Sequence, residues 1–281
     1  VCEGVSSAPQ SVTRAQAINL TRGLTGASCL AKHFGDELVV ADMGIALPYA
    51  CPEILNRSLG KGTANIAAGP AMARQTAVRG ILTGMGLAAQ AKRDGIQILG
   101  VGEMGIGNTT TASAVACALL GAEPRYLTGK GAGLSDAGLR RKIEVIEQSL
   151  ARLNPDSGDA VDVLSKVGGL DIAGMCGAFI GGAEAGIPVL IDGVISAVAA
   201  LCAANICPAS KDYMIASHMS GEPAAKFVFE KLGIRAPICA NMALGEGTGA
   251  VALMPLLDMA YAVYGGMLAF SDAGIEEYKP L

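Results

Sequence analysis

Two glutamates lie inside glycine-rich turns, where a carboxylate has room to act on a ligand. Glu103 lies in the segment 100–111, Gly-Val-Gly-Glu-Met-Gly-Ile-Gly-Asn-Thr-Thr-Thr, and Glu246 lies in the segment 244–250, Leu-Gly-Glu-Gly-Thr-Gly-Ala. A carboxylate beside a phosphate-binding turn is costly unless it has a task, so we interpret Glu103 as a catalytic residue. Glycines leave the carboxylate of Glu246 uncrowded, which suits a general base. The alternative for Glu246 is a structural carboxylate stabilised by the dipole of the following helix.

The turn around Glu103 also has the features of a phosphate site. It follows the apolar run 96–99 and leads into the alanine-rich segment 112–120. A turn between a strand and a helix directs backbone N–H groups at an anion, so Gly105, Gly107, Asn108 and Thr109 are predicted to contact a phosphate or ribose. The glycine spacing matches the dinucleotide fingerprint, but no acidic residue follows at the end of a second strand. A tight turn without a ligand and an NAD-linked oxidoreductase are the alternatives.

Two further segments are candidates for phosphate binding. Thr-Gly-Lys-Gly-Ala-Gly at 128–133 supplies backbone N–H groups, that of Gly131 among them, and a cation, without the spacing of a Walker loop. Ser220 and Gly221 follow a predicted strand and precede a predicted helix, where an anion is favoured, although Ser220 could equally be a simple N-cap. Asp192 closes another predicted strand, either as a ligand-binding residue at the sheet edge or as an N-cap.

Composition excludes several classes of function. The chain of 281 residues is 51% hydrophobic and 16% charged, with a net charge of −4, which argues against nucleic acid and anionic membranes as partners. The charge-free run 193–210 is alanine-rich, so we predict a buried helix and no membrane span. Eight cysteines without a C-x-x-C pair indicate reduced thiols in a cytoplasmic protein and no metal site. No signal peptide is visible.

Apolar runs alternate with helix-length segments along the chain. Strands are predicted at 38–41, 96–101, 189–191 and 213–216, and helices at 71–92, 112–120, 137–153, 170–185, 194–205 and 224–232. This order predicts an α/β fold with a doubly wound, mostly parallel, Rossmann-like sheet. Further helices within 12–23 and 247–264 are expected to form a smaller helical lobe. The predicted domains are therefore 37–246, which binds the nucleotide, and the lobe made of 1–36 plus about 247–281.

Several of these segments, taken together and in order, resemble one enzyme family. Segments 102–110 and 244–250 are similar to motifs of nicotinate-nucleotide–dimethylbenzimidazole phosphoribosyltransferases. The similarity continues through Glu-Gly-Val-Ser at 3–6, Gly-Thr-Ala-Asn at 62–65, Gly-Gly-Leu-Asp-Ile-Ala-Gly-Met at 168–175, Asp-Gly at 192–193 and Ser-His-Met-Ser-Gly-Glu-Pro at 217–223. Each motif alone is modest, but the set is specific and spans nearly the whole chain.

The resemblance implies an activity and a role for particular residues. The activity is transfer of 5-phosphoribosyl from nicotinate mononucleotide to 5,6-dimethylbenzimidazole or a related base in cobamide biosynthesis, with release of nicotinate and without a metal or cofactor. Glu246 aligns with the general base of the family and Glu103 with a second active-site glutamate near the ribose. The remaining implied contacts are Gly105, Lys142, Ser220 and Gly221 for the phosphate, and Ser6, Gln10, Met104 and Leu244 around the acceptor ring.

Relatives of this family leave two points open. Some use adenine or phenolic acceptors, and some work as paired, non-identical subunits. The chain is therefore expected to form a homodimer or a heterodimer with a paralogue, and a non-catalytic subunit of such a heteromer is the alternative to an active transferase.

Overall fold

A parallel three-stranded sheet lies at the centre of the protein. The structure, a computed structural model, describes residues 5–276 and residue 279. Strands β3 (Leu99–Gly100), β4 (Val189–Ile191) and β5 (Met214–Ala216) pair in that order. These strands coincide with three of the predicted ones, although β3 is shorter than the predicted 96–101. The predicted strand 38–41 instead meets a separate parallel pair, β1 (Ala41–Asp42) with β2 (Leu55–Asn56).

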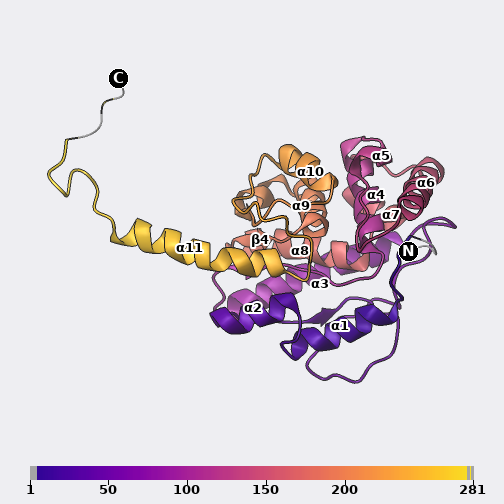
Figure 1. Ribbon diagram of the computed structural model, residues 1–281, viewed down its shortest axis with the longest axis horizontal. Coiled ribbons are helices and arrows are strands. Elements are labelled where there is room, and N and C mark those ends of the chain that lie inside the picture. The colour runs from indigo at the N-terminus through magenta and orange to yellow at the C-terminus, as the bar shows by residue number, and fades with distance from the viewer. Residues whose placement is uncertain (1–4, 277–278, 280–281) are drawn as a thin grey trace.

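Helices make up most of the described chain (Figure 1). Their bounds are α1 Ser11–Thr21, α2 Gly26–Phe34, α3 Arg74–Arg93, α4 Asn108–Leu120, α5 Pro124–Leu127, α6 Asp136–Leu153, α7 Ala160–Val167, α8 Leu170–Ala185, α9 Val194–Ile206, α10 Ala224–Leu232 and α11 Thr248–Gly266, with a 3₁₀ helix at Pro208–Tyr213. The helices predicted from periodicity are all present. Helices α2, α5 and α7 were not predicted, because they are short and lie in segments without a long apolar period.

Side chains of β4 show that helices cover both faces of the sheet. Val189 and Ile191 belong to the main core with residues of α4, α8 and α9, whereas Leu190 packs with Ala250 and Leu253 of α11. Successive side chains of a strand point to opposite faces, so the sheet is wound on both sides and the predicted α/β class is confirmed. The charge-free run 193–210 contains α9, whose residues 194–203 are buried, so the prediction of a buried helix is also confirmed.

Helices α3 and α8 approach closely because glycines line their contact. A Cβ atom placed on Gly84 would lie 1.8 Å from the carbonyl oxygen of Gly174. One placed on Gly177 would lie 1.8 Å from the carbonyl oxygen of Ile81. The two backbones therefore touch where side chains would otherwise separate them, and this contact fixes the position of the N-terminus of α8 relative to α3.

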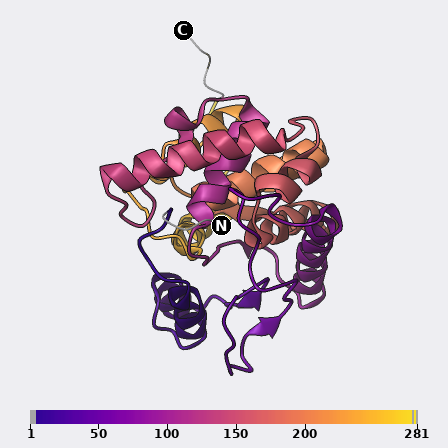
Figure 2. The same cartoon turned by 90° about the vertical axis from the view of Figure 1, so that its right-hand side faces the viewer.

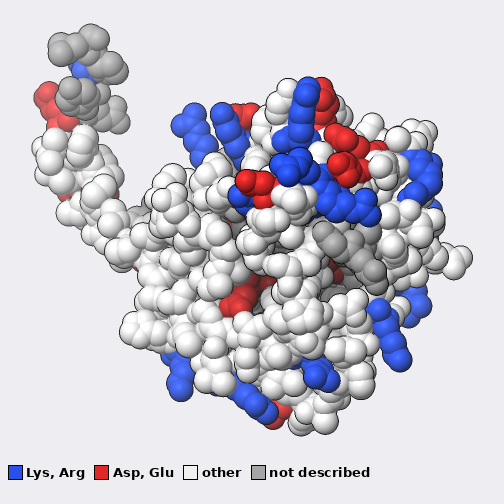
Figure 3. Space-filling view, turned by 45° about the vertical axis from the view of Figure 1, so that its right-hand side comes forward, with Lys and Arg blue, Asp and Glu red and all other residues white. Residues whose placement is uncertain are grey.

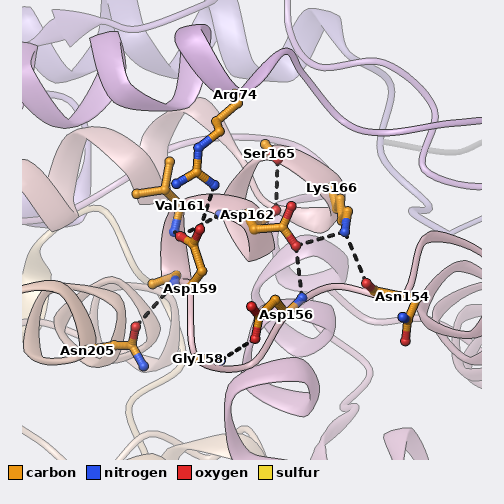
Figure 4. A network of polar contacts seen from close by, with 11 residues as sticks. Arg74, Asn154, Asp156, Gly158, Asp159, Val161, Asp162, Ser165, Lys166 and Asn205 are labelled. Atoms are coloured by element: carbon orange, nitrogen blue, oxygen red, sulfur yellow. Dashed lines mark hydrogen bonds and ion pairs between the residues drawn. The ribbon is translucent and has the colours of Figure 1, made fainter.

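A polar network ties the start of α7 to α3 (Figure 4). Asp159, the N-cap of α7, accepts hydrogen bonds from the N–H groups of Val161 and Asp162. Arg74 at the start of α3 contacts the same carboxylate at 2.7 Å, and Lys166 contacts Asp162 at 2.8 Å. The hydrogen bonds to Asp159 thus satisfy backbone N–H groups at the start of α7 that have no partner within the helix.

Helix α11 leaves the body of the protein. Its first turns are buried at Thr248, Gly249, Ala250 and Leu253, and it contacts α2, which in turn contacts α1. Its second half extends away from the other elements in Figure 1 and is seen nearly end-on in Figure 2. By length and composition alone, α11 is apolar enough to cross a membrane.

The division into a lobe of 1–36 plus about 247–281 and a domain of 37–246 stays a prediction.

Candidate active site

Residues that follow the three central strands converge at one edge of the sheet. Glu103 follows β3, Asp192 follows β4, and the pair Ser217 and His218 follows β5. Carboxyl ends of parallel strands lie at the same edge, which is where open α/β sheets bind ligands. Acidic side chains are visible inside a hollow on the face shown in Figure 3.

The two glycine-rich turns that carry Glu103 and Glu246 touch each other. The backbone N–H of Glu246 donates to the carbonyl oxygen of Glu103 at 3.2 Å. A Cβ atom on Gly102 would lie 2.3 Å from the backbone nitrogen of Gly247, and one on Gly245 would lie 2.9 Å from Oε1 of Glu103. The glycines therefore permit a backbone contact that no other residue would allow, and both glutamates border the same space.

Glu246 has a backbone conformation that is rare for its residue type. Its φ is 64°, and its neighbours Gly245 and Gly247 have φ values of 79° and 90°. The left-handed region costs a residue with a Cβ about 1–2 kcal/mol. Such outliers gather at functional sites, where the surrounding contacts hold them in place.

Asp192 supplies one of these contacts. It is 2% exposed, and its carboxylate accepts hydrogen bonds from the N–H groups of Gly247 at 3.1 Å and Gly249 at 2.6 Å. Asp192 therefore caps α11 and not α9, the helix that follows it in sequence, whose N-cap is Gly193. Burial raises the pKa of Asp192, against the opposing effect of these donors and of His218.

His218 is packed against the same turn. A Cβ atom on Gly249 would lie 2.0 Å from Nδ1 of His218, and this nitrogen lies 3.2 Å from the hydroxyl oxygen of Ser217. Burial lowers the pKa of His218, while the nearby Asp192 opposes that shift. The imidazole is thus part of the support beneath the Glu246 turn.

The carboxylate of Glu246 is held by the helices of the N-terminal segment. Gln16 of α1 donates from Nε2 to Oε1 at 3.3 Å, and the N–H of Gly26, the first residue of α2, donates to Oε2 at 3.1 Å. The side chain of Leu244 covers Gly26 so closely that a Cβ atom there would lie 2.4 Å from it. Sequence reasoning missed Gln16, because its only signal was a polar residue within a predicted helix.

The carboxyl group of Glu103 lies in an acidic and poorly solvated environment. The side-chain amide of Asn108 donates to Glu103 and also to Oδ2 of Asp171 at 2.8 Å. Burial raises the pKa of Glu103 to about 8, and the nearby Asp171, Asp192 and Glu246 add to the shift, while the Asn108 bond opposes it. Asp171 is thus a further acidic residue of this site, placed at the start of α8 by the 168–175 motif.

A second group of predicted residues lies beside the acids. We call it the cradle, and it consists of Lys142, Thr109 and the segment 129–131. Lys142 is 0% exposed, and its ammonium donates to Oγ1 of Thr109 at 2.9 Å and to the carbonyl oxygen of Gly129 at 3.0 Å. The N–H of Gly131 donates to Oε1 of Glu222 at 2.9 Å. Thr109 belongs to α4, whose start also carries Asn108, so the cradle and the acids share one helix N-terminus.

The remaining predicted residues lie in several separate segments of the chain. Met104, Gly105 and Gly107 are in the Glu103 turn, where Gly107 is the left-handed N-cap of α4 with φ 91°. The hydroxyl of Ser220 accepts the N–H of Glu222. Helix α10 begins at Ala224 as predicted, but its N-cap is Pro223 and not Ser220. The hydroxyl of Ser6 accepts the N–H of Ala8 in a local turn. Gln10 is exposed at the N-cap of α1, Gly221 is exposed beside Ser220, and Glu3 and Gly4 lie outside the described residues.

Comparison with known proteins identifies relatives that match nearly the whole chain. A family model described as phosphoribosyltransferase matches residues 1–275. The nicotinate-nucleotide–dimethylbenzimidazole phosphoribosyltransferases of Ruminiclostridium cellulolyticum and Acetivibrio thermocellus are each 46% identical to it, over 99% of this chain and 79% of their own length. The crystal structure of CobT from Thermus thermophilus superposes with a TM-score of 0.93 at 39% identity, covering 98% of this chain and 83% of that one.

The fold and the matched family model define the class of protein as a phosphoribosyltransferase. Within that class, the chain belongs to the nicotinate-nucleotide–dimethylbenzimidazole phosphoribosyltransferase family.

Proposed function

We propose that this protein transfers the 5-phosphoribosyl group of nicotinate mononucleotide to 5,6-dimethylbenzimidazole and releases nicotinate, a step of cobamide biosynthesis. The observation that carries the proposal is the contact between the two glutamate turns beside the Lys142 cradle. This arrangement offers acids for the sugar carbon and a cation for a phosphate within one site. The relatives at 46% identity carry the name of this reaction.

In this proposal Glu246 is the general base. The acceptor ring nitrogen attacks C1 of the ribose and must lose its proton, and a fixed carboxylate within reach is suited to take it. Gln16 and the N–H of Gly26 fix the orientation of that carboxylate. Leu244 and Met104, which neighbour the two glutamates in sequence, are proposed to contact the flat acceptor ring, with Ser6 and Gln10 at its border.

Glu103 is proposed to act at the ribose. The donor carries a pyridinium that leaves as a neutral ring, so positive charge moves to the sugar as the bond breaks. Carboxyl groups near such an oxocarbenium-like centre stabilise it. An arriving cation also offsets the repulsion among neighbouring acids that contributes to the raised pKa of Glu103, so substrate binding favours its charged form.

The phosphate of the donor is proposed to bind the cradle. Lys142 supplies an ammonium, Gly131 a backbone N–H group, and Ser220 with Gly221 the turn before α10. Gly105, Gly107, Asn108 and Thr109 are proposed to line the adjoining side, next to the ribose. Holding the phosphate fixes the sugar carbon relative to the acceptor, and such alignment supplies much of the rate acceleration of two-substrate enzymes.

The activity is tested by incubating the protein with nicotinate mononucleotide and a panel of benzimidazoles, adenine and phenols, and by identifying the products by mass spectrometry. We expect a ribotide of 5,6-dimethylbenzimidazole and one equivalent of nicotinate.

Glu246→Gln is expected to lower turnover about 100- to 10,000-fold, the range for loss of a general base, with nicotinate mononucleotide binding retained. Products formed from adenine or phenols alone would reassign the acceptor, and full activity of the variant would remove Glu246 as the base.

The working unit is proposed to be a homodimer joined through α11. The second half of this helix and the residues after it expose apolar side chains, including Met259, Tyr261, Tyr264, Met267 and Phe270. A contiguous apolar surface of this kind indicates an interaction site.

A location of the protein in the cytoplasm stays a prediction.

A further inference from the structure

The ammonium of Lys142 keeps one hydrogen-bond donor without a partner among the described residues. Its two hydrogen-bond acceptors, the Thr109 hydroxyl and the Gly129 carbonyl, are both neutral. Among the residues that the structure describes, no ion pair within 4.0 Å includes Lys142. An ammonium has three donors, so one remains for a further partner. Burial lowers its pKa to about 8, while Glu222 raises it and is the acidic group that acts on it.

Glu222 lies across the backbone of the cradle. Its Oε1 accepts the N–H of Gly131 at 2.9 Å, and a Cβ atom on Gly129 would lie 2.2 Å from its Oε2. The carboxylate therefore packs against the backbone of the segment 129–131. It occupies the space that a side chain at position 129 would need. The backbone N–H of Glu222 donates to Ser220 at 3.3 Å, so it engages both segments proposed to hold the phosphate.

A carboxylate and a phosphate compete for such a position. Both are acceptors of charge-assisted hydrogen bonds from the same donors, and two anions at one N–H group repel each other. The side chain of Glu222 has solvent into which it can swing, since the residue is only half-buried.

We propose that Glu222 is a built-in competitor for the donor's phosphate, which occupies the cradle between turnovers and must swing away before a phosphomonoester binds. The proposal rests on the function given above and adds an affinity-setting residue to it. Occupation by Glu222 lowers the apparent affinity of the cradle for phosphate. The apparent affinity is the intrinsic affinity multiplied by the fraction of molecules in which the cradle is open. The same competition helps to expel the phosphate of the product.

The test compares Glu222→Gln and Glu222→Ala with the wild-type protein. Glu230→Gln is the matched control, because it removes an exposed carboxylate from α10. Inorganic phosphate binding is measured by calorimetry and the KM for nicotinate mononucleotide by initial rates. We expect the dissociation constant for phosphate and the KM for nicotinate mononucleotide to fall about threefold to tenfold in the Glu222 variants, because the substitution opens a mostly occupied site. Both values are expected to stay unchanged in the control.

Nicotinate riboside, which has no phosphate, serves as the internal comparison. Its KM is not expected to fall in Glu222→Gln, since it does not need the cradle emptied. Unchanged or weaker binding of phosphate in both Glu222 variants, or no binding in any protein, would overturn the proposal. Absence of turnover in the wild-type protein counts against the proposed function instead, and the calorimetric comparison still decides the role of Glu222.

Discussion

Glu103 shares its surroundings with Asp171, Asp192 and Glu246, and this crowding has a consequence for folding. Burial and these neighbours raise the pKa of Glu103 to about 8 from a usual value of 4.5. The folded protein therefore keeps a proton that the unfolded chain loses as the pH rises through this interval. The contribution of Glu103 to the free energy of unfolding consequently falls between about pH 4.5 and pH 8.

Glu103→Gln is expected to gain stability relative to the wild-type protein as the pH rises from about 5 to about 8.5, the interval over which the wild-type carboxyl loses its contribution. Glutamine resembles the protonated acid and cannot become charged, so it escapes the cost of ionisation. Urea unfolding at several pH values measures the difference in unfolding free energy, with the exposed Glu184→Gln as the control. A difference that stays constant with pH would show that Glu103 is already charged in the folded protein at the acidic end of the series.

At the scale of elements, the approach of α3 to α8 determines where the acids of the site lie. Gly84 faces the backbone of Gly174, while Gly86 on the same helix is exposed and a Cβ atom there would meet nothing within 4 Å. Gly84→Ala is expected to destabilise the protein by about 1–3 kcal/mol through overpacking. Gly86→Ala is expected to stabilise it by about 0.5–1 kcal/mol, because alanine favours a helix.

Thermal and urea unfolding of the two alanine variants compare them directly. Because α8 begins at Leu170 beside Asp171, a shift of α8 in Gly84→Ala is also expected to lower turnover. Equal stability of the two variants would contradict the close backbone contact.

Local sequence patterns predicted the elements well and the contacts between them poorly. Helices α6 and α10 have apolar periods and clear ends, and both glutamate turns carry the glycines that left-handed N-caps require at Gly107 and Gly247. No local pattern indicates that Asp192 caps α11, or that Gln16 reaches Glu246. Those contacts join segments far apart in the chain, so they depend on the whole fold.

For the molecule as a whole, α11 is the element whose second half lies most openly in solvent. Tyr261 is 79% and Tyr264 is 89% exposed, and an isolated helix of this length is only marginally stable in water. A second copy of the chain would bury these side chains. Stability is then expected to rise with protein concentration.

Tyr264→Glu is expected to convert the proposed dimer into a monomer, because a charge in an apolar contact is costly to bury. Analytical ultracentrifugation measures the mass in solution, and Leu82→Glu, at an exposed apolar position of α3, is the control for added charge. A wild-type protein that sediments as a monomer would contradict the dimer. Flotation of the wild-type protein with lipid vesicles, or recovery only with a paralogous chain, would assign α11 another partner.

The backbones of Gly102 and Gly247 are in direct contact, so the spacing of the two glutamate turns is set by peptide units and not by side-chain rotamers. Neither turn can move aside for a bulkier ligand unless the other turn moves with it. A methyl group at Gly102 would act as a wedge between them, since it would lie within 2.6 Å of three backbone atoms of 246–247. These two glycines therefore determine how closely the two glutamate turns approach each other.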